Sequence, residues 1–251
     1  MMKNVIYLLI FLIFASCSSK KNVVYLQDIK DSNIYNTQFS EYKIKVDDII
    51  KIDFRAINQE SVSFFGASEN LSNSPESVKL NGYQVDNKGQ IYLPQVGELK
   101  VEGLTLIQTR SIISEKIKEY GLLTDPVIDL KIINSHFTIL GEVNKPGKYE
   151  FLKNNLHILE AIGMAGDLTI NGVRNDIKVI TNSAGLDYKT YSVDLTSKNA
   201  INNNFQIFSG DIIIVNPNSS KVKSAGVIGN AGNLLSLLSF ILTSIIVISN
   251  N

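Results

Sequence analysis

This chain gathers its apolar residues at its two ends, and that placement limits what the polypeptide can become. Near the start, Lys3 is followed by an unbroken apolar run over residues 5–15. Eleven residues of helix reach about 17 Å, too short for the roughly 30 Å hydrocarbon core of a bilayer. A basic start followed by an apolar run of this length is typical of a secretory signal peptide. We therefore expect export, with the signal peptide over residues 1–16.

The single cysteine directly follows this run. Cys17 ends the string Phe14-Ala15-Ser16-Cys17, which has small residues where a signal peptidase needs them. The string resembles a bacterial lipobox, with Phe14 where that pattern usually has Leu, and it implies that Cys17 is the lipid attachment site. The alternative is a buried apolar cysteine inside an uncleaved helix. Residues 17–40 are polar and lack periodicity, which predicts a linker after the lipid anchor.

The other end of the chain carries a longer apolar segment, with no charged residue after Lys223. From Val227 to Ile248 it holds twenty-two residues. That is about 33 Å of helix, enough to span a bilayer. Small and polar residues recur in this segment at steps of three and four, so they share one helical face. We call them the small-residue stripe: Gly229, Gly232, Ser236, Ser239 and Thr243.

From this segment we predict a transmembrane amphipathic helix over residues 225–248. Its apolar face suits lipid. The small-residue stripe permits close approach of a partner helix, or it borders a water-filled lumen enclosed by several identical helices. A buried C-terminal core helix is the alternative, because such a helix also buries apolar side chains.

The central region begins and ends with similar β patterns. Residues 42–54 alternate around the pair Asp47-Asp48, which predicts a strand, a tight turn and a second strand. Residues 205–215 are a near copy, in which Asp211 and the two Ile residues after it match Asp48 and its own Ile pair. This internal repeat indicates two related β elements that close the start and the end of the central region.

One helix and one strand are predicted between residues 105 and 133. Thr105 can cap a helix that Gly121 ends, and four apolar residues would share its face: Leu106, Ile113, Ile117 and Tyr120. Residues 127–133 then predict a strand that presents Ile128, Leu130 and Ile132 on one side. Residues 61–79 are rich in Ser and Asn, which predicts a long loop.

Residues 137–195 predict a second, small α+β unit. Two strands over residues 137–149 would be joined by a type II turn at Pro146-Gly147, where Gly would take a positive φ. A short helix over residues 156–165 would end at Gly166. Strands over residues 177–181 and 189–195 would flank a turn.

Six short motifs occur in a specific order along the chain. They are Asp48-Ile49-Ile50, the run over residues 89–97, Asp125-Pro126-Val127, Gly141-Glu142-Val143 with Pro146-Gly147, Leu159-Glu160-Ala161-Ile162 with Ala165-Gly166, and the run over residues 209–213. Together they resemble the outer-membrane polysaccharide export family, over nearly the whole chain. That family commonly has Gly where this chain has Asp47.

The resemblance implies an α+β fold with a β-rich polysaccharide export domain over residues 41–135 and a β-grasp-like, soluble-ligand-binding domain over residues 136–220. It implies a homo-oligomeric ring, commonly an octamer, whose C-terminal helices form a channel through the outer membrane. The implied partners are outer-membrane lipid, capsular or exopolysaccharide cargo, and an inner-membrane polysaccharide copolymerase. The soluble domains would lie in the periplasm.

Several other functions have little support in the sequence. Lys and Arg together equal Asp and Glu at 24 each, so no basic surplus favours nucleic acid. His136 and His157 stand far apart, and no second cysteine is present, so we expect neither a metal site nor a cofactor. Asp47, Asp48 and Asp167 fit turns and a helix end better than catalysis. We therefore expect no enzyme.

The function expected from these observations is an outer-membrane lipoprotein that forms an oligomeric channel for polysaccharide export. The main alternative is a periplasm-facing accessory lipoprotein that binds glycan or an export partner without forming a pore. A glycan hydrolase comes third, because no convergent pair of acidic residues is visible.

Overall fold

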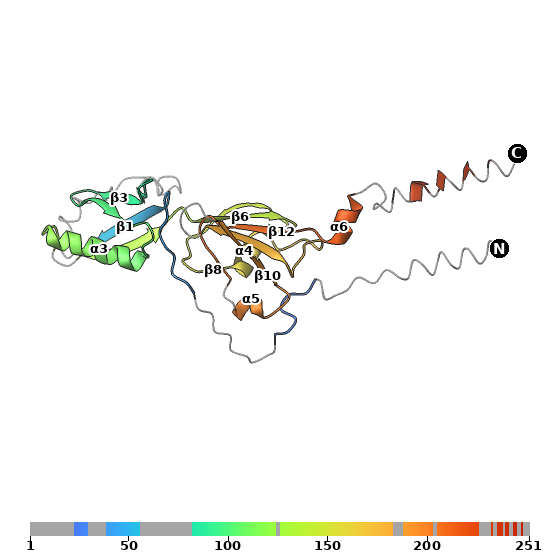
Figure 1. The fold of residues 1–251 in the computed structure, drawn as a ribbon, viewed down its shortest axis with the longest axis horizontal. Coiled ribbons are helices and arrows are strands. Elements are labelled where there is room, and N and C mark those ends of the chain that lie inside the picture. The colour runs from blue at the N-terminus through green and yellow to red at the C-terminus, as the bar shows by residue number, and fades with distance from the viewer. Residues whose placement is uncertain are drawn as a thin grey trace.

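The computed structural model describes residues 23–29, 39–55, 82–123, 126–182, 188–202 and 205–225, and single residues or short stretches between 232 and 247. It is a mixed α/β structure with several sheets and few helices, as the sequence predicts (Figure 1). Two separate hydrophobic cores are present, one built from residues 44–132 and one from residues 137–215. We call the corresponding parts the first module and the second module.

In the first module, a small antiparallel sheet packs against one helix. Strand β1 (Ile49–Arg55) lies between β2 (Tyr83–Gln84) and β5 (Val127–Ile132), and β3 (Gln90–Leu93) forms a hairpin with β4 (Gly97–Lys100). The predicted face of β5 is confirmed, because Ile128, Leu130 and Ile132 are all buried.

Helix α3 (Leu106–Glu119) lies where the sequence predicts it. Its N-terminus is a capping box, in which the Thr105 hydroxyl accepts from the Gln108 amide at 3.2 Å and the Gln108 side chain accepts from the Thr105 amide at 2.9 Å. Ile113 and Ile117 are fully buried. The prediction for Tyr120 is wrong: it is the C-cap residue and half exposed, since the helix ends before this position can face the core.

The second module is built on a mixed five-stranded sheet. Its strands are β6 (His136–Gly141), β7 (Gly147–Glu150), β9 (Ile177–Asn182), β10 (Tyr188–Val193) and β12 (Ile212–Val215), in the order β10-β9-β12-β6-β7. The central strands β6 and β12 run parallel, and the other neighbours are antiparallel. Helix α4 (Ile158–Met164) contributes Ile158, Ala161 and Ile162 to the core beneath this sheet.

The remaining elements of the second module are short. They are β8 (Leu156–His157), which pairs with β11 (Gln206–Ile207), and α5 (Asn199–Asn202). The predicted helix therefore begins two residues late, because Leu156 and His157 are held in strand pairing by β11. The predicted strand before Asp47 is also absent, and Lys43 makes only an isolated bridge with Thr105. The expected loop over residues 61–79 and the turn after β9 lie outside the described residues.

The connection between β6 and β7 differs from the prediction. Gly147 is not among the glycines with positive φ, so the type II turn at Pro146-Gly147 is wrong. Gly147 is instead the first residue of β7. The glycine with positive φ is Gly141, at +92°. Within the connection, the Lys145 amide donates to the carbonyl of Ala165, the C-cap residue of α4, at 2.9 Å. The connection is thus a wider loop that packs on the end of α4, not a tight hairpin.

Residues 23–29 are bound to the second module, although the sequence predicts a linker there. The Leu26 amide donates to the Leu195 carbonyl at 3.0 Å, and the Gln27 amide donates to the Thr196 carbonyl at 2.7 Å. The side chains of Tyr25 and Leu26 pack against the second core. We call residues 23–29 the N-terminal strap.

After β12 the chain forms the short helix α6 (Ser219–Ser224), capped by the Asn218 side chain, which accepts from the Lys221 amide at 2.9 Å. Beyond α6, the described residues are helical: Gly232, Leu235–Leu237, Ser239, Phe240, Thr243, Ser244 and Val247. Within the described part of the chain, no helix has both the length and the apolarity that crossing a membrane requires. The transmembrane helix over residues 225–248 stays a prediction, since most of that range lies outside the described residues.

Candidate functional site

The two copies of the internal repeat form turns of the same construction. In the first, the Asp48 carboxylate accepts from the Lys45 amide at 2.8 Å. In the second, the Asp211 carboxylate accepts from the Phe208 amide at 2.8 Å. In both turns the Asp amide also donates back to the carbonyl three residues earlier. The similarity seen in the sequence is therefore a similarity of backbone geometry.

The residue before each Asp has a positive φ. Asp47 has φ +68° and Gly210 has φ +87°, so the two turns pass through the left-handed region at the same position. That region suits Gly and strains residues that carry a Cβ, although Asp tolerates it better than most. Asp47 thus adopts the backbone conformation that Gly adopts more easily, and the strain lowers the free energy of unfolding.

This comparison predicts the outcome of two substitutions at Asp47. Asp47→Gly should raise the free energy of unfolding by about 0.5 to 1 kcal/mol, because the relief of left-handed strain exceeds the backbone entropy that Gly adds to the unfolded chain. Asp47→Ala should lower it, because Ala keeps the Cβ and loses the local polar contacts. Urea unfolding of the two variants beside the wild type measures both effects, and a less stable Gly variant would contradict the strain argument.

The two turns meet where the modules join. The Lys45 ammonium donates to the Ser209 carbonyl at 3.1 Å. The Tyr42 and Phe208 rings stack with centroids 6.3 Å apart. Beside them, the buried Gln206 amide side chain accepts from the Ser40 amide at 2.9 Å and donates to the Ser40 carbonyl at 3.1 Å. We call this set of contacts the module junction.

The ionisable groups of the module junction are partly or wholly withdrawn from water. Burial raises the pKa of the Asp48 carboxyl above its ordinary value, although hydrogen bonds from the Lys45 amide and the Tyr42 hydroxyl oppose that rise. Burial also raises the pKa of Asp211, and a hydrogen bond from Thr181 opposes it. Burial lowers the pKa of Lys45. All three shifts favour neutral side chains, as desolvation requires.

A pH dependence of stability follows from the two buried carboxyls. A carboxyl whose pKa is raised by folding stabilises the protein most in acid, and its contribution falls as the pH rises from the ordinary Asp value through the raised one. Replacing both, as Asp48→Asn with Asp211→Asn, should remove this decline. Urea unfolding between pH 4 and pH 7 measures it as the difference in slope between wild type and variant.

Asp176 provides a control, because its pKa is shifted in the opposite direction. Hydrogen bonds from Lys178 and Ser192 lower the pKa of this exposed carboxyl. Its contribution is therefore present above the ordinary Asp value and lost as the pH falls. Asp176→Asn should change the slope in the other direction, and an identical change in both variants would show that the buried pair has no special role.

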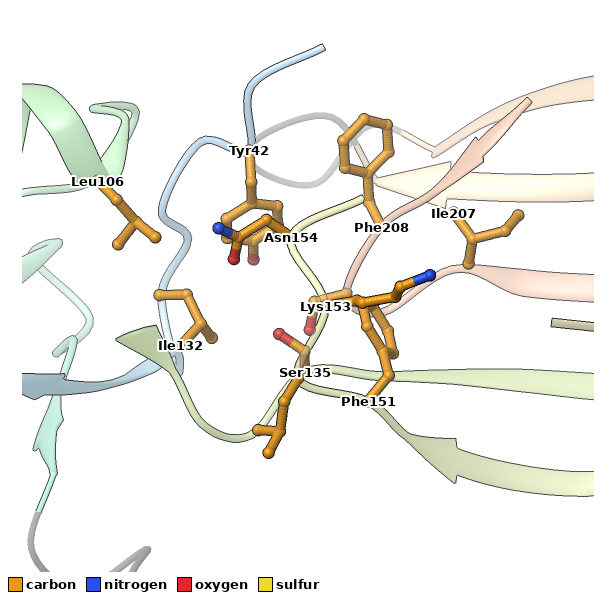
Figure 2. Close-up of a pocket in the computed structure, with 11 residues that line it drawn as sticks. Tyr42, Leu106, Ile132, Ser135, Phe151, Lys153, Asn154, Ile207 and Phe208 are labelled. Carbon is orange, nitrogen blue, oxygen red and sulfur yellow. The ribbon is translucent and has the colours of Figure 1, made fainter. Parts of the chain in front are cut away.

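The module junction is closely packed at its centre and open at one side. Figure 2 shows the centre, where Leu106 and Ile132 of the first module face Phe151, Ile207 and Phe208 of the second. The remaining cavity there measures only about 20 Å³, close to the size of one water molecule.

The open side is a cleft of about 250 Å³. Its lining residues are Ser40, Glu41, Tyr42, Lys43, Lys45, Thr181, Asn182 and Phe208. Among the described residues, the Asn182 side-chain oxygen is buried there without a hydrogen-bond partner. The junction centre can hold the modules together, and the cleft could accept a small polar group.

The predicted site residues lie elsewhere. Cys17 and Gly229 are outside the described residues. Four members of the small-residue stripe, Gly232, Ser236, Ser239 and Thr243, are exposed and helical. The Ser239 hydroxyl donates to the Ser236 carbonyl at 2.9 Å, and the Thr243 hydroxyl donates to the Ser239 carbonyl at 2.7 Å. Across the described ranges, no three His, Cys, Asp or Glu side chains gather to hold a metal ion.

Two family models match consecutive parts of this chain. The model described as "Polysaccharide biosynthesis/export protein" matches residues 36–133, and that of the SLBB domain matches residues 135–215. Together they cover more than two thirds of the sequence. The chain belongs to the polysaccharide export family. The module junction lies where the two matched regions of this family meet.

Two curated proteins that this chain is similar to carry the same description. One is the EPS I polysaccharide export outer membrane protein EpsA of Ralstonia nicotianae, 27% identical over 60% of this chain and 39% of the relative. The other is the protein of that description from Ralstonia solanacearum, 25% identical over 42% of this chain and 28% of the relative. The aligned region thus spans less than half the length of either relative.

Proposed function

We propose that this protein takes part in polysaccharide export at the bacterial outer membrane, as a lipid-anchored protomer of an oligomeric channel. Family membership and the names of the Ralstonia relatives support the export role. The string that ends at Cys17 supports lipid attachment at that residue. The cargo would be capsular or exopolysaccharide, delivered by an inner-membrane polysaccharide copolymerase. Export proteins of this kind move cargo without covalent chemistry, so we propose no enzymatic activity.

The observation that supports the channel most directly is the chemistry of the small-residue stripe. The hydroxyls of Ser239 and Thr243 each donate their proton to a carbonyl of their own helix. Their oxygens can then accept hydrogen bonds from water on the outer side of the helix. Leu237, in contrast, is apolar and exposed in the single protomer, and no member of the small-residue stripe lies three or four residues from it, so it is on another side of the helix. The segment therefore offers one surface for water and another for lipid.

Such a helix is stable in a bilayer only inside a closed assembly. A single copy would expose its polar face to hydrocarbon, where unsatisfied polar groups are expensive. A ring of identical helices turns every polar face toward a shared lumen and every apolar face toward lipid. We propose a homo-oligomeric ring for this reason, with eight protomers as the family resemblance implies.

We also assign residues 41–135 to the export domain and residues 136–220 to a β-grasp-like domain. The two hydrophobic cores and the boundaries of the two family matches support this division. The parallel pair β6 and β12, covered by α4, supports the β-grasp comparison. Both domains would lie in the periplasm.

A tag placed after Asn251 tests the channel proposal. A spanning helix carries the tag to the cell surface, so antibody should label intact cells as strongly as it labels permeabilised ones. Labelling restricted to permeabilised cells would overturn the spanning helix. Electron microscopy of detergent-purified, full-length protein provides the second measurement, in which closed rings are expected and strictly monomeric particles would contradict the proposal.

The alternative is an accessory lipoprotein that binds glycan in the periplasm without forming a pore. The cleft beside the module junction favours it, since its lining combines the aromatic side chains of Tyr42 and Phe208 with the polar side chains of Lys43 and Asn182. Isothermal titration with fragments of the exported polymer, using wild type and Tyr42→Ala, tests this role. Binding that depends on Tyr42, combined with a protected C-terminal tag, would favour the accessory protein.

A further inference from the structure

The two segments that lead toward membrane attachments meet on one loop of the second module, residues 167–174. On one side, this loop binds the chain just before α6: the Val173 amide donates to the Asn216 carbonyl at 2.9 Å, and the Asn218 amide donates to the Asn171 carbonyl at 2.7 Å. Gly172 also forms an isolated bridge with Pro217. The start of α6 is therefore fixed to the loop by backbone bonds.

On its other side, the same loop holds the N-terminal strap. The Tyr25 hydroxyl donates to the Asp167 carboxylate, and the Arg174 guanidinium lies over the Tyr25 ring, 5.5 Å from its centroid. Arg174 is itself buried, and its guanidinium donates to the Gly172 and Thr169 carbonyls at 2.8 and 3.2 Å. The loop thus contacts both the N-terminal strap and the chain that leads into α6.

The segments that separate the loop contacts from the proposed membrane attachments are short, which brings the loop close to lipid. Only residues 18–22 separate Cys17 from the strap, and five extended residues reach at most about 18 Å. Helix α6 ends at Ser224 with Ala225 as its C-cap residue, and the predicted membrane segment begins at residue 225. If the anchor and the C-terminal helix enter the outer membrane as proposed above, the loop over residues 167–174 must lie near the bilayer surface. In Figure 1, α6 leaves the second module on the side away from the first.

The side chains around this place suit a lipid surface. Ile170 on the loop is 66% exposed, Val222 on α6 is 58% exposed, and Val24 on the strap is 39% exposed. Lys221 and Lys223 are exposed on α6. Single exposed apolar residues are common on proteins, but here they flank both segments that lead to lipid. Apolar side chains beside lysines are the composition that binds at the interface of an anionic membrane.

We propose that Val24, Ile170, Val222, Lys221 and Lys223 form a membrane-facing surface that contacts the headgroup layer of anionic phospholipid. The apolar side chains enter the boundary between headgroups and acyl chains, and the ammonium groups pair with lipid phosphates. The contacts of Tyr25 with Arg174 and Asp167 hold the N-terminal strap, which follows Cys17, against this surface. The inference rests on the proposed anchor and C-terminal helix, and it adds a specific orientation of the second module on the bilayer.

Site-directed fluorescence tests this orientation in the full-length, lipidated protein. Acylation consumes the thiol of Cys17, the single native cysteine, so Ile170→Cys and Val222→Cys each introduce the one reactive thiol of their variant. The labelled proteins are reconstituted in vesicles of phosphatidylethanolamine and phosphatidylglycerol that contain headgroup nitroxide lipid. Val127→Cys is the matched control, because Val127 is 63% exposed but lies on β5 of the first module.

Labels at residues 170 and 222 should be quenched severalfold more strongly than the label at residue 127. Lys221→Glu with Lys223→Glu should weaken the quenching at residue 170, and replacing phosphatidylglycerol by phosphatidylcholine should reduce it in the wild type. Equal quenching at residues 170 and 127 would overturn the inference. So would a label at residue 170 that is shielded from lipid and crosslinks to a second copy, since that result assigns the surface to a neighbouring protomer.

Failure of this inference and failure of the channel proposal give different results. Strong quenching at residue 170 with a protected C-terminal tag would retain the membrane-facing surface and reject the spanning helix. Absent quenching with an accessible tag would reject the membrane-facing surface and retain the spanning helix.

Discussion

Deleting residues 225–251 should abolish surface polysaccharide while the remaining protein accumulates to near its normal level. Both hydrophobic cores lie between residues 44 and 215, so the deletion removes none of their side chains. The loss of export would follow from the loss of the membrane segment alone. Immunodetection of surface polysaccharide on a strain that carries only the truncated gene measures the first effect, and immunoblotting measures the second. Unchanged surface polysaccharide would contradict the channel.

Point variants test whether export requires the small-residue stripe or only an apolar segment. Ser236→Leu with Thr243→Leu keeps the segment apolar but removes hydroxyls from the small-residue stripe. We expect export to fall strongly, since the lumen would lose polar surface and the close helix approach would be blocked. Leu235→Met with Leu242→Met is the matched control, because Leu-to-Met exchange preserves volume and apolarity. Equal export by both pairs would argue that the segment acts only as an anchor.

The largest expected effect on stability is at Gly141. Its φ is +92°, and an added Cβ would overlap the backbone carbonyl oxygen of Val215, which belongs to the parallel neighbour β12. The two residues are the last of β6 and β12, and relief of the overlap would separate these paired strand ends and break the hydrogen bond from the Glu142 amide to the Val215 carbonyl. Gly141→Ala should therefore lower the free energy of unfolding by at least about 3 kcal/mol, a large part of what a domain of this size has. Thermal or urea unfolding measures the loss directly.

Gly147 is the matched control for this substitution. It lies in the same β6–β7 hairpin, its φ is not positive, and no heavy atom lies within 4 Å of an added Cβ. Gly147→Ala should change the free energy of unfolding by no more than about 0.5 kcal/mol. A similar loss in both variants would mean that the hairpin tolerates no side chain at all, and the specific clash at Gly141 would lose its support.

Local patterns predicted most of the regular structure correctly. The capping box at Thr105 and the spacing of Ile113 and Ile117 placed α3, because a helix boundary and its buried face depend on residues close in sequence. The alternating apolar residues placed β5 for the same reason. The internal repeat indicated matching turns, and the backbone at Asp47 and Gly210 agrees with it.

Predictions failed where distant contacts decide the conformation. The motif Pro146-Gly147 has the composition of a type II turn, but packing on the end of α4 selects a wider loop. The N-terminal strap lacks periodicity, and its order comes from partners far along the chain, such as Asp167 for Tyr25. The repeat also gave no sign that its two turns contact each other, since Lys45 and Ser209 are 164 residues apart.

Residues 133–135 connect the two modules, and hydrogen bonds hold both Asn134 and Ser135. The Asn134 side chain accepts from the Ile49 amide at 2.8 Å and donates to the Asp47 carbonyl at 2.8 Å, while the Ser135 carbonyl accepts from the Phe151 amide at 3.0 Å. Each end of the connection is therefore tied to its own module, and the hydrogen bond from Lys45 to Ser209 crosses between them. A rotation of one module against the other has to break that bond and separate the stacked rings of Tyr42 and Phe208.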